Sequence, residues 1–152
     1  MSFYADIGHC IDIDNVSAEV DLGSGYEALV TDTVGFIRKL PHHLVASFRS
    51  TLEEAREADL LVHVIDISHP DWEEQKQVVE EVLENLDLVA GPQILLFNKV
   101  DRITHDEEQV LRARVRALDE TPAVFVSALQ NSDLAPLVQV LRARIRALLP
   151  RV

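Results

Sequence analysis

Short runs of apolar residues alternate with amphipathic helical patterns along most of this chain, and this alternation limits the folds that it can adopt. Four runs are candidate strands: Ala28 to Thr31, Leu60 to Ile65, Gln93 to Phe97 and Ala123 to Val126. Each is almost continuously apolar, which is typical of strands in a parallel sheet that helices cover on both faces. The pattern predicts an α/β fold, a three-layer sandwich with a mostly parallel sheet and helices on both faces.

A helical pattern follows each of the four runs. Pro41 opens a predicted helix that extends to Glu57, since proline is tolerated in a first helical turn. Acidic residues after Pro70 favour a second helix, and Thr104 with Glu107 has the spacing of a capping box for a third. A fourth predicted helix follows Ser132, with an apolar stripe that consists of Leu134, Leu137, Leu141, Ile145 and Leu148.

The first 27 residues follow a different pattern, in which apolar and polar residues alternate. Gly23-Ser24-Gly25 predicts a hairpin turn, which pairs a strand from Val16 to Leu22 with the Ala28 run. We therefore expect a single domain over residues 1–152, with a diverged N-terminal segment over 1–27 and the main α/β region over 28–152.

Composition limits the partners and the compartment. The 152 residues carry a formal net charge of −12, which repels phosphate polymers and anionic membranes, so we expect no membrane partner and no autonomous nucleic-acid binding. Cys10 is the one cysteine, and no segment has the pattern of a signal peptide or a membrane span. These features favour a reducing cytoplasm.

Two polar motifs follow neighbouring predicted strands. Asn98-Lys99-Val100-Asp101 comes directly after the run that ends at Phe97, and Ser127-Ala128 follows the next run. Ligands of open α/β sheets bind beyond the carboxyl ends of the strands, where these motifs and Asp32 all fall. The sequence therefore predicts one ligand site at this edge of the sheet.

The residue types suit guanine. An aspartate carboxylate accepts hydrogen bonds from N1–H and the 2-amino group together, an asparagine amide serves the N7/O6 edge, and a backbone N–H donates to O6. Adenine would leave buried groups unpaired, and the stem of Lys99 can cover the face of the base. The simpler alternative makes Asn98 and Asp101 turn residues and Ser127 a helix cap, but the ordered series of motifs argues against it.

The stretches DTVGFIRKLP, TLEEAREADLL, VIDISHP, NKVD and VSAL together resemble the GTPase domain of the HflX family of ribosome-associated GTPases. The resemblance extends from about Leu29 to the end of the sequence. It implies a Ras-like G domain, GTP or GDP with Mg²⁺ as ligands, and the large ribosomal subunit as a partner. It also implies that the helix from Pro41 to Glu57 belongs to the second switch.

The same resemblance implies a role for individual residues. Asp32 would reach Mg²⁺ through water, and Gly35 would donate its N–H to the γ-phosphate. Asn98, Lys99 and Asp101 would read guanine, while Ser127 and Ala128 would complete the base pocket. Phe36 stands where many small GTPases place a glutamine that orients the attacking water, so no catalytic residue is assigned.

The phosphate half of such a site is not found in the sequence. A Gly-rich loop ending in Gly-Lys-[Ser/Thr] should precede Asp32, yet the first lysine is Lys39. Asp12 falls near the position of the switch threonine, where its charge would repel a phosphate. From base contacts alone we expect a dissociation constant around 1 mM or weaker, and no GTP hydrolysis by this chain alone.

A G domain without this loop would also lack its first strand, which lies in the sheet's centre between the Ala28 and Leu60 strands. The sequence leaves three possibilities: the two strands close on each other, Phe3 to Ile7 fills the position, or the chain is a fragment of a longer protein. It also leaves two functions open. One is the nucleotide-binding part of an HflX-like GTPase with impaired GTP binding and hydrolysis, and the other is a degenerate pseudo-GTPase that serves as a protein or ribosome interaction module without nucleotide.

Overall fold

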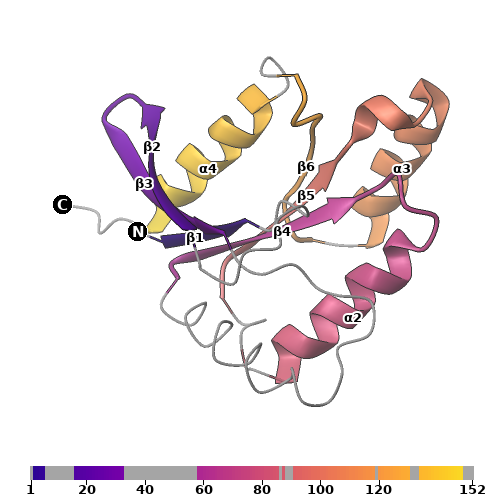
Figure 1. Cartoon of the computed structure of the whole chain (residues 1–152), viewed down its shortest axis with the longest axis horizontal. Helices are drawn as coiled ribbons and strands as arrows, with labels where there is room; N and C mark the ends of the chain where they lie inside the picture. Colours follow the sequence, from indigo (N-terminus) through magenta and orange to yellow (C-terminus); the bar gives the residue numbers. More distant parts are fainter. Residues whose placement is uncertain are drawn as a thin grey trace.

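The computed structural model describes residues 2–5, 16–32, 58–85, 87, 91–118, 120–130 and 134–148. Over these residues the chain forms one six-stranded sheet with flanking helices (Figure 1). The strands are β1 (Ser2–Ala5), β2 (Val16–Gly23), β3 (Tyr26–Asp32), β4 (Leu60–Asp66), β5 (Gln93–Asn98) and β6 (Ala123–Phe125). The helices are α2 (Trp72–Asn85), α3 (His105–Leu118) and α4 (Ala135–Leu148), and the 3-10 turn η2 (Val100–Arg102) follows β5.

All four apolar runs therefore form strands, and the predicted helices after Pro70, Thr104 and Ser132 are present. The capping box is confirmed as well, because the Thr104 N–H and hydroxyl donate to Glu107 Oε2 at 2.7 and 2.8 Å. The predicted helix from Pro41 to Glu57 lies outside the described residues. No helix within the described ranges is long and apolar enough to span a membrane.

The order of the strands is β2-β3-β1-β4-β5-β6, and every neighbouring pair is parallel except the β2–β3 hairpin. β1 lies between β3 and β4, with Phe3 in register with both Val30 and Leu60. The expectation of a sheet without its first central strand is therefore wrong. Ser2–Ala5 fills the position that one of the possibilities gave to Phe3 to Ile7, and residues 6 and 7 lie outside the described part of the chain. The physical reason is that two unpaired inner edges would leave backbone donors and acceptors without partners.

The β2–β3 hairpin turns through Ser24 and Gly25, as predicted from the Gly-Ser-Gly sequence. Both residues have positive φ, 58° and 78°, which matches the turn to the right-handed twist of the paired strands. Gly23, with φ 78°, follows a register shift that begins at Asp21, whose carboxylate accepts the Gly23 N–H at 2.7 Å. The hairpin forms the outer edge of the sheet.

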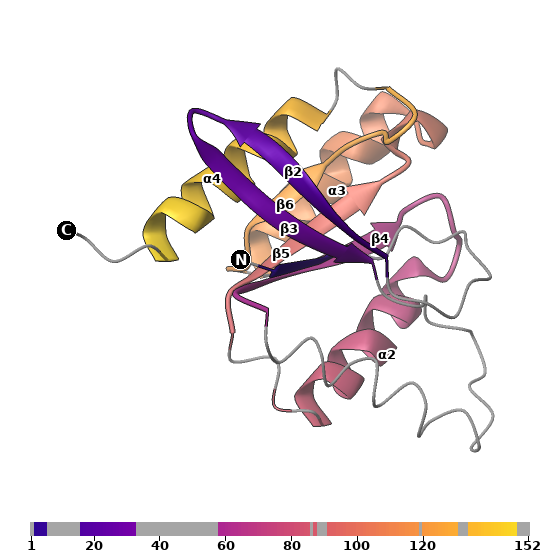
Figure 2. The same cartoon turned by 60° about the vertical axis from the view of Figure 1, so that its left-hand side comes forward.

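Helices cover both faces of the sheet, as Figures 1 and 2 show: α4 lies on one face beside the hairpin, and α2 lies on the other. Leu141 and Ile145 of α4 share one buried core with residues of five strands: Leu22, Ala28, Leu60, Ile94 and Val124. A second core on the opposite face contains Val115 of α3 with Ile65, Leu95, Phe97 and Phe125. The three-layer arrangement is thus confirmed.

The apolar stripe of α4 holds for most of its length. Leu141 and Ile145 are buried, and Leu134 and Leu137 are partly buried, but Leu148 at the end of the helix is 39% exposed. Arg142 also joins the helix to the hairpin, because its Nε donates to the carbonyl oxygen of Leu22 at 3.0 Å. α4 therefore fixes the hairpin by both apolar and polar contacts.

Candidate nucleotide-binding site

The carboxyl ends of β4, β5 and β6 bring the two polar motifs together. Asp66 at the end of β4 is in register with Asn98 at the end of β5. The segment after β6 is joined to β5 by the Val126 N–H, which donates to Phe97 O at 2.9 Å, and by the Val100 N–H, which donates to Val126 O at 3.2 Å. Backbone hydrogen bonds thus place the Asn98–Asp101 segment beside Ser127 and Ala128.

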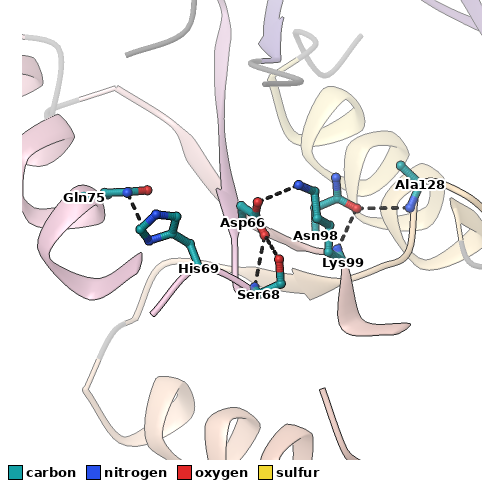
Figure 3. A network of polar contacts seen from close by, with 7 residues as sticks. All are labelled: Asp66, Ser68, His69, Gln75, Asn98, Lys99 and Ala128. Atoms are coloured by element: carbon teal, nitrogen blue, oxygen red, sulfur yellow. Dashed lines mark hydrogen bonds and ion pairs between the residues drawn. The ribbon is translucent and has the colours of Figure 1, made fainter. Parts of the chain in front are cut away.

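Asn98 joins the two motifs through its side chain. Its Oδ1 accepts the N–H of Ala128 at 3.0 Å and the N–H of Lys99 at 2.8 Å (Figure 3). Because the amide oxygen is engaged in this way, the amide nitrogen is the group with which Asn98 can meet a ligand, as a donor. The contact also brings the exposed Ala128 to the rim of the same site.

Ser127 and Asp101 form the second link. Ser127 is fully buried, with a relative exposure of 0%, and its Oγ donates to Asp101 Oδ1 at 2.6 Å. Asp101 belongs to η2 and is exposed, so its carboxylate is anchored on the protein side and open to a ligand on the other. The hydroxyl of Ser127 thus orients a carboxylate from another segment, in addition to any part that the residue plays in its own turn.

Lys99 has the left-handed backbone conformation, with φ 67° and ψ 36°. Its Nζ donates to Asp66 Oδ2 at 2.6 Å, and Asp66 Oδ1 accepts from the N–H and the Oγ of Ser68 at 3.0 and 2.6 Å. Partial burial of Asp66 opposes ionisation, but the hydrogen bonds from Lys99 and Ser68 and the charge of Lys99 hold the pKa of this carboxyl below its ordinary value. Asp66 is therefore an anionic anchor for Lys99.

Asp66 and Ser68 were not among the predicted site residues. A signal was available, because Asp66 ends an apolar strand next to β5, just as Asp32 and Asn98 end theirs. What the sequence did not give was the partner, since the ion pair joins residues 33 positions apart.

The predicted phosphate-side residues are not placed with the base-side ones. Asp32 ends β3, and β1 and β4 separate β3 from β5 in the sheet. Gly35 lies outside the described residues. Within the parts of the chain that the structure describes, no group of three or more His, Cys, Asp or Glu side chains could hold a metal ion.

Two histidines lie on β4 or shortly after it. The Nδ1 of His69 accepts the N–H of Asp71 at 3.1 Å and lies 3.2 Å from Nε2 of Gln75, so this ring caps the start of α2 (Figure 3). His63 lies in the middle of β4, where its Nδ1 is buried without a hydrogen-bond partner among the described residues. Burial, and then the positive charge of Lys76, lowers the pKa of His63 from 6.5 to about 4.

This buried histidine predicts acid sensitivity of the fold. His63 stays neutral in the native state down to pH about 4, whereas in the unfolded state it takes up a proton near pH 6.5. The stability that depends on a neutral His63 is therefore fully present above pH 6.5 and is lost as the pH falls toward 4. Over this interval the free energy of unfolding should fall by up to about 3 kcal/mol. Urea unfolding from pH 7.5 to 4 measures it. A His63→Leu variant should lose less stability over this interval than the wild type, and equal losses would contradict the prediction.

Comparisons with known proteins show what this chain is similar to. The family model of the 50S ribosome-binding GTPases matches residues 11–99. GTPase HflX of Magnetococcus marinus is 41% identical over 138 residues, which are 90% of this chain and 31% of that protein. GTPase HflX of Escherichia coli is 36% identical over 133 residues, 88% of this chain and 30% of that protein. The chain thus spans about a third of the length of these two relatives.

Solved structures agree on the fold. A crystal structure of SsGBP in complex with GDP matches with a TM-score of 0.73 at 26% identity, over 88% of this chain and 43% of that one. An Era variant of Aquifex aeolicus bound to GDP and aluminium fluoride matches with a TM-score of 0.61 at 19% identity, over 91% of this chain and 45% of that one, and this match speaks for the fold alone. Because the family model covers more than half of the sequence, the chain belongs to the 50S ribosome-binding GTPase family, and it is similar to the HflX proteins.

Proposed function

We propose that this chain is the guanine-binding part of an HflX-like, ribosome-associated GTPase that works in the cytoplasm. The observation that carries the proposal is the hydrogen-bonded cluster in which Asn98 contacts Ala128 and Asp101 contacts Ser127 at the carboxyl ends of β5 and β6. Two loops far apart in the sequence thereby present a carboxylate, an amide and a backbone N–H to one place. These are the three groups that the guanine edge requires.

Each group has a defined part in binding the base. The Asp101 carboxylate, oriented by the Ser127 hydroxyl, accepts from N1–H and the 2-amino group of guanine. The Asn98 amide nitrogen donates to N7. The Ala128 N–H, which now donates to Asn98 Oδ1, turns to O6 when the base is present, and the stem of Lys99 lies along the face of the ring. Adenine fits none of the Asp101 contacts, because it offers neither N1–H nor a 2-amino group.

On the phosphate side of the site, the roles of Asp32 and Gly35 are proposed from the family alone. By family membership Asp32 would reach Mg²⁺ through water and Gly35 would donate to the γ-phosphate. Mg²⁺ in such sites is held by one or two protein groups together with nucleotide phosphates, which is consistent with a single carboxylate at the end of β3. The 152 residues contain no Gly-Lys-[Ser/Thr] loop, so we propose weak nucleotide binding and no GTP hydrolysis by this chain alone.

A nucleotide titration tests the proposal. We expect GDP and GTP to shift the amide NMR signals of Lys99 and Ala128 with dissociation constants on the order of 1 mM, and ATP to cause no comparable shift. GDP and GTP should differ little, because the base supplies most of the contacts.

Two results would reject the proposal that the chain binds guanine selectively: equal shifts with ATP, or no shift up to about 10 mM GDP. Either result would favour a pseudo-GTPase that contacts protein or ribosome without nucleotide. Co-sedimentation with isolated large ribosomal subunits tests the proposed partner separately, since the chain belongs to the 50S ribosome-binding GTPases.

A further inference from the structure

We propose that Asp66 is a positioning residue for guanine recognition, because its carboxylate holds Lys99 in the left-handed conformation from which Asn98 and Asp101 face one base. This inference rests on the proposed function and extends it to a residue of a third strand. Neither the guanine motif nor the predicted site contains Asp66.

The backbone of Lys99 needs such an anchor. A non-glycine residue at φ 67° is in a sparsely populated conformation, and such strain persists only where the surroundings hold it. Three hydrogen bonds act on Lys99: its N–H donates to Asn98 Oδ1 at 2.8 Å, its carbonyl oxygen accepts the Arg102 N–H at 3.0 Å, and its Nζ donates to Asp66 Oδ2 at 2.6 Å. The first two come from neighbours in the sequence, whereas the third comes from another strand.

Asp66 is itself held in place. Its other oxygen accepts both the N–H and the hydroxyl of Ser68, and the neighbouring Ile67 N–H donates to the carbonyl oxygen of Asn98 at 3.3 Å. The end of β4 is thus fixed to the end of β5 by contacts that do not involve the Lys99 side chain. The carboxylate is a preorganised acceptor, so less conformational freedom is lost when the ion pair forms.

The conformation of Lys99 sets the direction of both base-reading side chains. Asn98 precedes it directly, and η2 with Asp101 begins at the next residue, with the Arg102 N–H bonded to the Lys99 carbonyl at 3.0 Å. A change of φ at Lys99 therefore rotates Asn98 and Asp101 relative to each other. Two groups that must meet one rigid base lose affinity together when their relative orientation is lost.

Asp66 also has a simpler role, as the residue that caps the turn at Ser68. The variant Asp66→Asn separates the two roles. Asparagine keeps one oxygen for the Ser68 contacts but replaces the second oxygen with an NH₂ group, which is a donor and repels the Lys99 ammonium. The capping role is retained and the anchor is removed.

We expect Asp66→Asn to weaken GDP binding about 5- to 10-fold, the range for loss of one charged hydrogen bond whose partners are 37% exposed. Asp66→Glu, which keeps the charge, should recover part of this loss. The matched control is Glu80→Gln, which removes the acidic partner of Lys76 within α2 and should leave GDP affinity unchanged.

A double-mutant cycle with Lys99→Gly makes the test specific. Glycine adopts the left-handed conformation without strain and has no ammonium group, so Asp66→Asn should have no further effect on GDP affinity in the Lys99→Gly background. If Asp66→Asn lowered GDP affinity equally in the wild type and in Lys99→Gly, the positioning role would be overturned. Asp66 would then act only by capping the turn at Ser68. A wild-type level of GDP binding in Asp66→Asn would overturn it too, while the proposed function would stand.

A second readout does not depend on nucleotide. The backbone chemical shifts of Lys99 and Asn98 should change in Asp66→Asn, and Lys99 amide hydrogen exchange should accelerate, while Glu80→Gln changes neither. Unchanged shifts and exchange would overturn the inference even if the wild type binds no guanine nucleotide. The wild type could instead bind no GDP while Asp66→Asn shows the expected changes at Lys99. That result would reject the proposed function, and Asp66 would still be the residue that holds Lys99.

Discussion

Phe97→Ala is expected to lower the free energy of unfolding by about 3 to 5 kcal/mol, the range for deleting a fully buried aromatic side chain. Phe97 is 0% exposed. Its ring stacks on Phe125 with centroids 4.8 Å apart and meets Trp72 edge to face at 5.8 Å. The variant leaves a cavity between α2, β5 and β6 and removes both aromatic contacts. Urea denaturation followed by far-UV circular dichroism measures the loss.

Phe97→Leu provides the graded comparison if the alanine variant does not fold, because leucine fills part of the cavity. It should lose less than Phe97→Ala. Val110→Ala is the surface control, since Val110 on α3 is 69% exposed and its loss should stay within about 0.5 kcal/mol. A loss below about 1 kcal/mol for Phe97→Ala would show that the second core does not depend on this ring.

Asp101→Asn is expected to reverse the base preference from guanine to xanthine. In the proposed complex the carboxylate of Asp101 accepts two hydrogen bonds from guanine, whereas an asparagine amide would place one donor against the 2-amino group. Xanthine carries an oxygen at position 2, which that donor can meet. We expect GDP affinity to fall about 10-fold or more and xanthosine diphosphate to bind more tightly than GDP.

Titration of both nucleotides against the wild type and the variant measures the reversal. Asp106→Asn is the matched control, because it makes the same change of charge at an exposed residue in the first turn of α3. Asp101→Asn could instead lower the affinity for both nucleotides equally, or leave the preference for guanine intact. Either result would show that the Asp101 carboxylate does not select the base.

The sequence predicted the strands, and the proximity of the polar residues that follow β5 and β6, for a local reason. Each candidate strand is marked by its own apolar run, and a parallel sheet places the residues after such runs at one edge. Asn98, Asp101, Ser127 and Ala128 therefore met as expected. The conformation of a short turn, such as the left-handed Lys99, and the ion pair to Asp66 depend on contacts across strands, which no local pattern specifies.

The central strand shows the same limit in another form. Residues 2–5 alternate in polarity as an exposed or half-covered strand does, so nothing in their pattern marks them as central. Their place between β3 and β4 follows from two empty edges that only the assembled sheet creates. Similarly, Leu148 continues the helical stripe of α4 but is exposed, because period alone does not tell where the facing surface ends.

The place of β1 has a consequence for the order in which the sheet assembles. Residues 2–5 precede both of the strands that flank them, and these strands run to residues 32 and 66. The middle of the sheet therefore closes only through pairings distant in sequence, which form slowly because a long loop must close first. The units from β4 to α4, which carry Asp66, Asn98, Asp101 and Ser127, join through shorter connections and should consolidate while the centre is still open.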